Sequence, residues 1–160
     1  MPMFNSIIRM TLFNRIGYLM ISLFLVSSCQ TYSDSDKSAF DKNISEYLHR
    51  KGIECTKSPS GLYYKIIRQG KGETIQFQDV VSFCYKGYFL NGEVFDHVKK
   101  PVEFQVKDLI GAWKEIMLEL KPGSSVYLVA PPQLGYGDRE LDDIPANSIL
   151  VFEMEIINVK

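Results

Sequence analysis

The sequence is poor in the residues that build metal centres and covalent active sites. Its 160 residues include only two histidines and three cysteines. His49 and His97 lie far apart, and neither has a cysteine or carboxylate at metal-ligand spacing. No Ser-His-Asp or Cys-His set is evident either. We therefore expect no metal site and no cofactor, and any chemistry has to proceed without a nucleophile.

The sequence also lacks an excess of charge of either sign. Its formal net charge is −1, which leaves no basic surface typical of nucleic-acid-binding proteins, so we expect no nucleic-acid partner. With 46% hydrophobic, 12% aromatic and 23% charged residues, the composition is that of a soluble domain that can fill a core. Without a targeting segment this length fits one domain, which we expect to be a monomer.

No apolar run is long enough to cross a membrane. The longest extends from Ile16 to Val26 and follows Arg9 and Arg15, the only charges before position 29. A run of this length favours the central region of a secretory signal over a transmembrane helix.

The residues that end this run, Val26-Ser27-Ser28-Cys29, resemble the lipobox of bacterial lipoproteins. That resemblance implies a signal peptide over residues 1–28 and a mature chain anchored in the cell envelope by a lipid on the Cys29 thiol. Because Gln30 rather than aspartate follows the cysteine, we expect the outer membrane, with the domain facing the periplasm. The alternative is an ordinary signal cleaved nearby, with Cys29 incidental.

Two further cysteines, Cys55 and Cys84, remain in the mature chain. In an oxidising compartment they could form one disulfide, but the sequence does not show that they meet. Free thiols are the favoured alternative.

Residues 29–59 are expected to connect the anchor to the main domain. The stretch from Gln30 to Ser38 is polar and rich in serine and aspartate, which indicates a flexible tether. Apolar residues then recur at helical spacing and predict a short amphipathic helix that ends near Gly52. These residues are Ala39, Phe40, Ile44, Tyr47 and Leu48. No chemistry is evident on this helix, so we expect a role in packing or spacing.

The remaining sequence carries mainly the alternating pattern of strands. A strand from Val80 to Leu90 places Val81, Phe83 and Tyr85 on one face and leads into Asn91-Gly92, a strong hairpin signal. Further strands are expected at Leu62–Arg68, Val102–Val106, Val126–Ala130 and Leu150–Ile156.

One helix interrupts these strands. Asp108 can cap it, and Lys121-Pro122-Gly123 ends it. Its apolar side is formed by Leu109, Ile110, Trp113, Ile116, Met117 and Leu120. Antiparallel strands with one short helix predict an α+β domain over residues 60–160, in which a curved antiparallel sheet wraps around the helix.

A series of short motifs in this domain resembles the FK506-binding-protein family of peptidyl-prolyl isomerases. They are Ser60-Gly61-Leu62 with Tyr64-Lys65, Val81-Ser82-Phe83-Cys84-Tyr85-Lys86-Gly87, Asn91-Gly92-Glu93-Val94-Phe95-Asp96, Ile110-Gly111-Ala112-Trp113, Leu120-Lys121-Pro122-Gly123, Gly135-Tyr136-Gly137, Ile144-Pro145 and Leu150-Val151-Phe152-Glu153. With the lipobox and the N-terminal helix, the chain also resembles the lipoprotein isomerases associated with gliding motility.

The resemblance implies an aromatic site for a proline ring. Trp113 would form its floor, and Tyr85, Phe95 and Phe152 its walls. Val102 would lie at the rim, where other members often have an aromatic residue. Taken singly, such aromatic residues on a helix or on alternating strands are more often core.

The resemblance also implies polar contacts to the bound peptide. The Ile110 N–H would bind a substrate carbonyl beside Leu109, the Tyr136 hydroxyl would bind another, and Asp96 would face the carbonyl before proline. Ile144 would close the rim. Independently, a tyrosine between two glycines in a loop favours a site over a core. The residues expected to act in catalysis are Tyr85, Phe95, Asp96 and Tyr136.

Such a site suits rotation about the peptide bond before proline. Twisting this bond costs about 18–20 kcal/mol, because amide resonance is lost. A low-dielectric aromatic site disfavours the planar, polar amide relative to the twisted one, and fixed donors hold the flanking peptide bent. No proton transfer or covalent intermediate is needed.

Two departures from the family pattern affect this expectation. Lys99 and Lys100 follow the Phe-Asp pair where members often have an arginine, and lysine cannot reproduce the planar guanidinium fork that would steady Asp96. The acidic segment over residues 138–143 is expected to repel acidic substrates.

The sequence thus predicts a peptidyl-prolyl cis-trans isomerase that acts on proline-containing envelope or secreted polypeptides, and the resemblance implies FK506-like macrolides as further ligands. The alternative is a non-catalytic chaperone or scaffold that holds proline-containing segments in the same site. A third reading is a purely structural lipoprotein in which the aromatic residues are only core.

Overall fold

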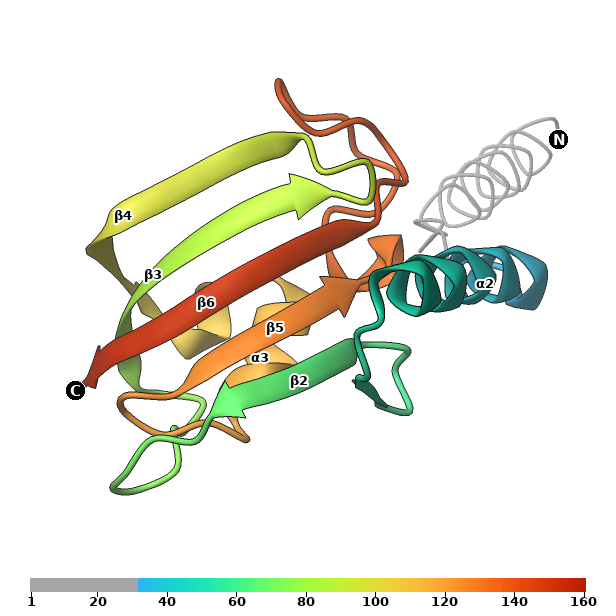
Figure 1. Ribbon diagram of the computed structural model, residues 1–160. Coiled ribbons are helices and arrows are strands. Elements are labelled where there is room, and N and C mark those ends of the chain that lie inside the picture. The colour runs from blue at the N-terminus through green and yellow to red at the C-terminus, as the bar shows by residue number, and fades with distance from the viewer. Residues whose placement is uncertain (1–31) are drawn as a thin grey trace, which may run out of the picture. The chain divides into compact units, whose positions relative to one another are not determined.

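The computed structural model describes residues 32–160, so the expected signal peptide and Cys29 lie outside the described residues. Within that part of the chain, six strands form one antiparallel sheet in the order β1-β2-β5-β6-β3-β4 (Figure 1). The strands are β1 (Thr56–Lys57), β2 (Tyr63–Arg68), β3 (Val80–Phe89), β4 (Val94–Gln105), β5 (Ser125–Ala130) and β6 (Leu150–Val159).

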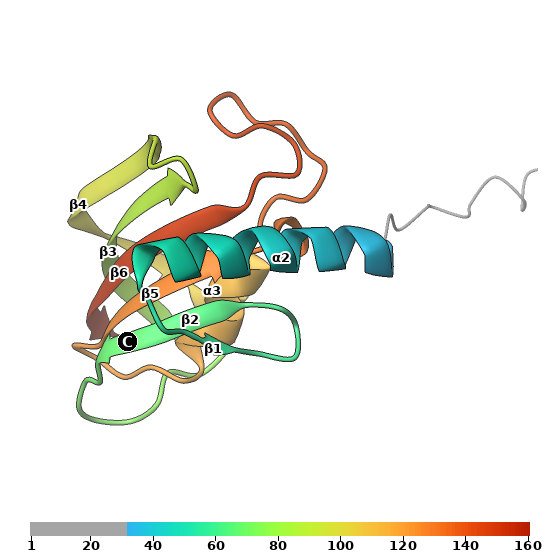
Figure 2. The same cartoon turned by 45° about the vertical axis from the view of Figure 1, so that its right-hand side comes forward.

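Two α-helices lie on opposite faces of this sheet, as Figures 1 and 2 show together: α3 (Gly111–Met117) on the inner face and α2 (Asp34–Lys51) on the outer face. Strand β6 separates the two faces by simple alternation. Its residues Leu150, Phe152, Met154 and Ile156 are buried against the inner core, whereas Glu153 and Glu155 are exposed. The expected α+β fold with a sheet wrapped around a short helix is confirmed.

Helix α2 packs against the outer face of the sheet, so its role is in packing. Its buried residues Ile44, Tyr47 and Leu48 form a second core with residues of β2, β5 and β6. These are Tyr63, Tyr127, Val129 and Val151. Burial of about 25 cal/mol per Å² of apolar surface makes this contact a substantial part of the domain's stability.

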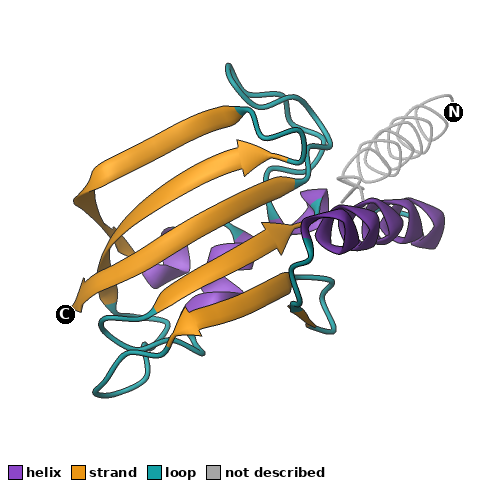
Figure 3. Cartoon of the chain, viewed as in Figure 1, coloured by secondary structure: helices purple, strands orange, loops and turns teal. Residues whose placement is uncertain are grey.

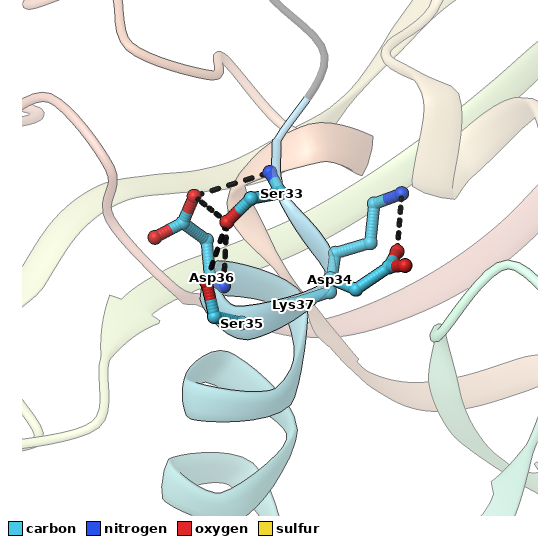
Figure 4. Close-up of polar contacts among 5 residues, drawn as sticks. All are labelled: Ser33, Asp34, Ser35, Asp36 and Lys37. Carbon is cyan, nitrogen blue, oxygen red and sulfur yellow. Dashed lines mark hydrogen bonds and ion pairs between the residues drawn. The ribbon is translucent and has the colours of Figure 1, made fainter.

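The N-terminus of α2 corrects the expected tether. The helix begins at Asp34 rather than near Ala39, because Ser33 and Asp36 form a reciprocal capping box (Figure 4). The Ser33 hydroxyl accepts from the Asp36 N–H at 3.1 Å, and the Ser33 N–H donates to Asp36 Oδ2 at 3.1 Å. The serines and aspartates that suggested disorder are therefore a cap and a first turn suited to the helix dipole. The expected end at Gly52, with a φ of 65°, is confirmed.

The helix under the sheet is shorter than the sequence indicated. Asp108 does not cap it, because Val106–Asp108 forms the separate 3₁₀ helix η2 and α3 begins only at Gly111. The backbone at Leu109 and Ile110 is extended, which breaks the continuous helix that the apolar spacing suggested. Leu109 and Leu120 are nevertheless buried in the inner core. A second 3₁₀ helix, η3 (Pro132–Leu134), follows β5.

Strand β4 is longer than expected because it starts at Val94, directly after the hairpin, and continues past Pro101 to Gln105. Proline is compatible with a strand here because β4 is the edge of the sheet, where an N–H on the open side has no ladder partner to lose. Cys55 and Cys84 are free thiols. No helix within residues 32–160 has the length and apolarity needed to span a bilayer.

Candidate functional site

Trp113 stands at the centre of an aromatic group on the inner face of the sheet. It lies in α3 and is only 8% exposed. The rings of Tyr85, Phe152 and Phe83 pack edge-on around its indole, with centroids 4.8, 5.0 and 5.3 Å away. Edge-to-face pairs of this kind contribute about 0.5–1.5 kcal/mol each beyond their buried area. Three β-strand side chains thus fix the orientation of one helical indole.

Phe95 extends this group toward the hairpin. Its ring lies 5.7 Å from that of Phe152 and 5.0 Å from that of Phe89, and it is partly exposed. The ring can lie flat on β3 only because Gly87 has no side chain, since a Cβ there would approach the Phe95 ring to 2.6 Å. The glycine in the middle of a strand therefore marks a close approach.

Asp96 is oriented by Tyr85. The Tyr85 hydroxyl donates a short hydrogen bond to Asp96 Oδ2. The ion pairs within residues 32–160 do not include Asp96, so neither Lys99 nor Lys100 takes the place of the arginine that the family resemblance led us to expect. The Tyr85 hydroxyl, rather than an arginine, thus holds the Asp96 carboxylate in place, and it does so without neutralising the negative charge.

The two tyrosine hydroxyls of the site remain protonated at neutral pH. Burial, followed by the hydrogen bond to Asp96, raises the pKa of Tyr85 far above its ordinary value. Burial and the nearby charge of Asp96 also raise the pKa of Tyr136. Both residues are therefore hydrogen-bond donors over the physiological range.

Tyr136 and Ile144 come from the long connection between β5 and β6. Tyr136 packs against the inner core and is partly exposed, whereas Ile144 is only 7% exposed. A pair of backbone hydrogen bonds between Leu141 and Ile144, at 2.9 and 3.2 Å, folds the tip of this loop. Tyr136 thus lies in a glycine-flanked loop at the margin of the inner core.

Ile110 precedes α3 and supplies its N-cap backbone. Its carbonyl accepts from the N–H groups of Trp113 and Lys114 at 3.0 Å each, whereas its own N–H has no hydrogen-bonding partner among residues 32–160. Leu109 is buried beside it, and Val102 of β4 is partly buried against the same core. The structure therefore brings every site residue that the sequence suggested to the inner core or its margin, apart from Cys29, which lies outside the described residues.

Sequence reasoning missed three residues that support the site. Phe83 packs on Trp113, Phe89 packs on Phe95, and Gly87 leaves room for Phe95. The signals were present, because Phe83 shares the strand face of Tyr85 and an isolated glycine within a strand indicates close packing.

The described residues offer no metal centre at this site or elsewhere. Within residues 32–160 no group of three histidine, cysteine, aspartate or glutamate side chains could hold an ion. The buried Trp113 Nε1 also lacks a hydrogen-bond partner in that part of the chain. The groups that converge here are aromatic faces, one carboxylate and a few donors, which can bind and bend a peptide but not attack it.

A groove of about 610 Å³ opens beside Phe95, between the β3–β4 hairpin and the β5–β6 loop. Figure 3 shows these loops at the same end of the sheet. The apolar part of its lining includes Phe89, Phe95, Leu141 and Pro145. Its carboxylates are Glu93, Glu140, Asp142 and Asp143, and no lysine or arginine lines it. A peptide that leaves the aromatic site on this side meets negative charge.

We predict that the domain loses stability in alkali. Burial raises the pKa of Tyr85, Tyr88, Tyr127 and Tyr136 above the ordinary value of 10.0. Their contribution to stability is then complete below pH 10.0 and is lost as the pH rises above that value toward the folded-state pKa values. Urea midpoints measured from neutral pH upward should be constant and then fall above that point. A midpoint that rises in alkali would contradict these shifts.

Comparison with known proteins places this geometry in a family. The family model described as FKBP-type peptidyl-prolyl cis-trans isomerase matches residues 71–157. An FKBP-type isomerase, FkpA of Buchnera aphidicola (strain APS), is 40% identical over 121 residues, which are 74% of this chain and 48% of that protein. The chain spans about half the length of the curated relatives it matches.

Solved structures give the same result. The crystal structure of FkpA from Escherichia coli has a TM-score of 0.69 at 31% identity and covers 91% of this chain and 71% of that one. The crystal structure of AtFKBP13 has a TM-score of 0.64 at 30% identity and covers 68% of this chain and 100% of that one.

Proposed function

Because the chain belongs to the family of FKBP-type peptidyl-prolyl cis-trans isomerases, we propose that it catalyses rotation about the peptide bond before proline. The observation that carries this proposal is the group around Trp113, in which Tyr85, Phe95 and Phe152 surround the indole and Tyr85 holds Asp96. The substrates would be proline-containing polypeptides.

The mechanism follows from the loss of amide resonance. Twisting the bond costs about 18–20 kcal/mol in water. A proline ring on Trp113 lies among aromatic rings, which solvate the planar, charge-separated amide poorly and the twisted amide well. The free Ile110 N–H and the protonated Tyr136 hydroxyl bind flanking carbonyls and hold the peptide bent. Each tenfold gain in rate needs about 1.4 kcal/mol of such discrimination.

A protease-coupled assay on a short X-Pro peptide tests the proposal. The full-length chain should accelerate the slow cis-to-trans phase in proportion to its concentration. Asp96→Ala and Tyr136→Phe should reduce kcat/KM without lowering the urea midpoint. The absence of acceleration by the folded wild-type protein would reject the enzymatic function.

The non-catalytic alternative rests on two departures from the family pattern, the missing arginine beside Asp96 and Val102 at the rim. The first departure is offset, because the Tyr85 hydroxyl orients the Asp96 carboxylate instead. Binding of proline peptides without turnover, together with binding that is unchanged in Asp96→Ala and Tyr136→Phe, would restore that alternative.

Macrolide binding and a monomeric state belong to the same proposal. An FK506-like macrolide would occupy the aromatic site as a proline mimic, quench the fluorescence of the only tryptophan and inhibit the isomerase competitively. Sedimentation should give the mass of one chain. Macrolide binding without inhibition would place the ligand elsewhere.

The membrane anchor is also a proposal, because Cys29 lies outside the described residues. It is supported by the lipobox-like Val26-Ser27-Ser28-Cys29 after a short apolar run. We propose that residues 1–28 are removed and that a lipid on Cys29 holds the domain in the outer membrane, facing the periplasm. Mass spectrometry of the mature N-terminus should find an acylated cysteine, and Cys29→Ser should release the protein from the membrane fraction.

The acidic groove predicts a preference for basic substrates. Peptides that differ only in a lysine or a glutamate next to the X-Pro pair should differ in kcat/KM by about twofold to fivefold, because exposed charge pairs contribute about 0.2–1 kcal/mol each. The preference should shrink at high salt. It should also shrink in a variant that carries Glu140→Gln, Asp142→Asn and Asp143→Asn, which removes three lining carboxylates. Equal rates at low salt would exclude a role of the groove.

A further inference from the structure

Tyr32, two residues before the start of α2, contacts the loop that carries Tyr136. The Tyr32 hydroxyl donates a hydrogen bond of 2.6 Å to Asn147 Oδ1. The Tyr32 ring packs edge-on against Phe40 of α2, with centroids 5.3 Å apart and planes at 82°. The capping box of Ser33 and Asp36 fixes the backbone between Tyr32 and the helix (Figure 4). Tyr32 is thus held by α2 on one side and binds the loop on the other.

Asn147 and Gly137 lie where the two sides of the β5–β6 loop come together, and this pair is called the neck of the loop. The Asn147 N–H donates to the Gly137 carbonyl at 2.8 Å, and Gly137 directly follows Tyr136. Asn147 has a φ of 62° and is the only non-glycine residue with a positive φ among residues 32–160. Glycine would satisfy that backbone conformation more readily. Asparagine adds a side-chain acceptor, and Tyr32 is the residue that uses it.

The Tyr32 hydroxyl touches both sides of the neck. It binds Asn147, and a Cβ placed on Gly137 would lie 3.9 Å from its oxygen. Burial, with smaller effects of Asp138 and Asp36, raises the pKa of Tyr32 above its ordinary value. The hydroxyl therefore stays protonated, and so remains a donor, at neutral pH.

We propose that Tyr32 is a positioning residue for the isomerase site: through Asn147 it fixes the neck of the β5–β6 loop and thereby the place of the Tyr136 hydroxyl. The segment before α2, which leads toward the N-terminus, then determines how well Tyr136 holds the bound peptide. This inference rests on the proposed function, because Tyr136 matters only if a peptide is bound there.

The test combines Tyr32→Phe with Tyr136→Phe in the full-length chain. Tyr32→Phe keeps the ring on Phe40 and removes only the hydroxyl. We expect it to lower kcat/KM by about threefold to tenfold, the rate equivalent of one net hydrogen bond. In the Tyr136→Phe background, Tyr32→Phe should have no further effect on kcat/KM, because the Tyr136 hydroxyl that Tyr32 positions is already absent.

Asn147→Gly is the partner variant, because glycine keeps the positive φ and removes the acceptor. It should reproduce the Tyr32→Phe loss, and the two should not add. Tyr88→Phe is the matched control, since it removes a tyrosine–carboxylate hydrogen bond of 2.9 Å to Glu153 on the outer face. That variant should keep wild-type kcat/KM. Additive losses of Tyr32→Phe and Tyr136→Phe, or wild-type activity of Tyr32→Phe, would overturn the proposal.

Amide hydrogen exchange separates this proposal from the enzymatic one. Tyr32→Phe should speed exchange of the Asn147 N–H, whereas the Ile156 N–H, which donates to Ser124 at 2.8 Å in the sheet region, should be unchanged. If the wild-type protein were inactive, the proposed function would be rejected. The exchange rate of the Asn147 N–H would still show whether the Tyr32–Asn147 hydrogen bond holds the loop. Unchanged exchange at Asn147 would show that Tyr32 does not hold the neck.

Discussion

Replacing Trp113 by alanine is expected to lower the free energy of unfolding by about 3–5 kcal/mol, the range for removing a large aromatic side chain from a core. The indole is 8% exposed and has three aromatic rings packed against it, so the cavity would be lined on several sides. Urea denaturation at constant pH measures the change. Isomerase activity should be lost even where the variant is still folded, because the proline ring has no floor.

Phe77→Ala is the matched control for this prediction, because Phe77 is also aromatic but 46% exposed. Its cost should remain within about 1 kcal/mol, as is usual for surface positions. If Trp113→Ala lowered the free energy of unfolding by less than about 1 kcal/mol, the indole would not be the centre of the inner core.

Gly87→Ala is expected to be the most damaging single-methyl change in the site. The new Cβ would lie 2.6 Å from the Phe95 ring and 3.1 Å from that of Phe152. Overpacking of this kind costs about 1–3 kcal/mol. Because the ring can only relieve the contact by leaving the site wall, kcat/KM should fall as well. Urea denaturation and the peptide assay give the two effects separately.

A second substitution identifies the cause. Phe95→Leu removes the ring that the new methyl group meets, so the double variant with Gly87→Ala should be more stable than the sum of the two single losses predicts. Strict additivity would show that the alanine acts on the strand backbone rather than on Phe95.

Much of the inner face could be predicted from the sequence because it follows local rules. The alternation from Leu150 to Ile156 fixes one buried face, and Asn91-Gly92 marks the turn between β3 and β4. The order of the motifs then identified the aromatic residues before their contacts were known. The rings of Tyr85 and Phe152 contact that of Trp113. Each of these residues lies on a strand or helix whose buried side follows from the spacing of its apolar residues.

The errors arose where tertiary contacts override local pattern. Asp36 lies in a polar stretch that suggests disorder, yet its reciprocal bond with Ser33 starts a helix whose stability comes from packing on the sheet. Apolar spacing suggested one helix from Leu109 to Leu120, but both residues are buried without being helical. The contact of Tyr32 with Asn147 joins residues that are 115 positions apart in the sequence, and no local signal predicts it.

The account is tested most directly by exchange NMR of an X-Pro peptide in the presence of the full-length protein labelled at its only tryptophan. We expect exchange between the cis and trans peptide resonances to accelerate with substoichiometric protein. The indole N–H resonance of Trp113, which has no partner among the described residues, should shift saturably with peptide in the same sample. Unaltered exchange together with a stationary indole resonance would contradict the central claim.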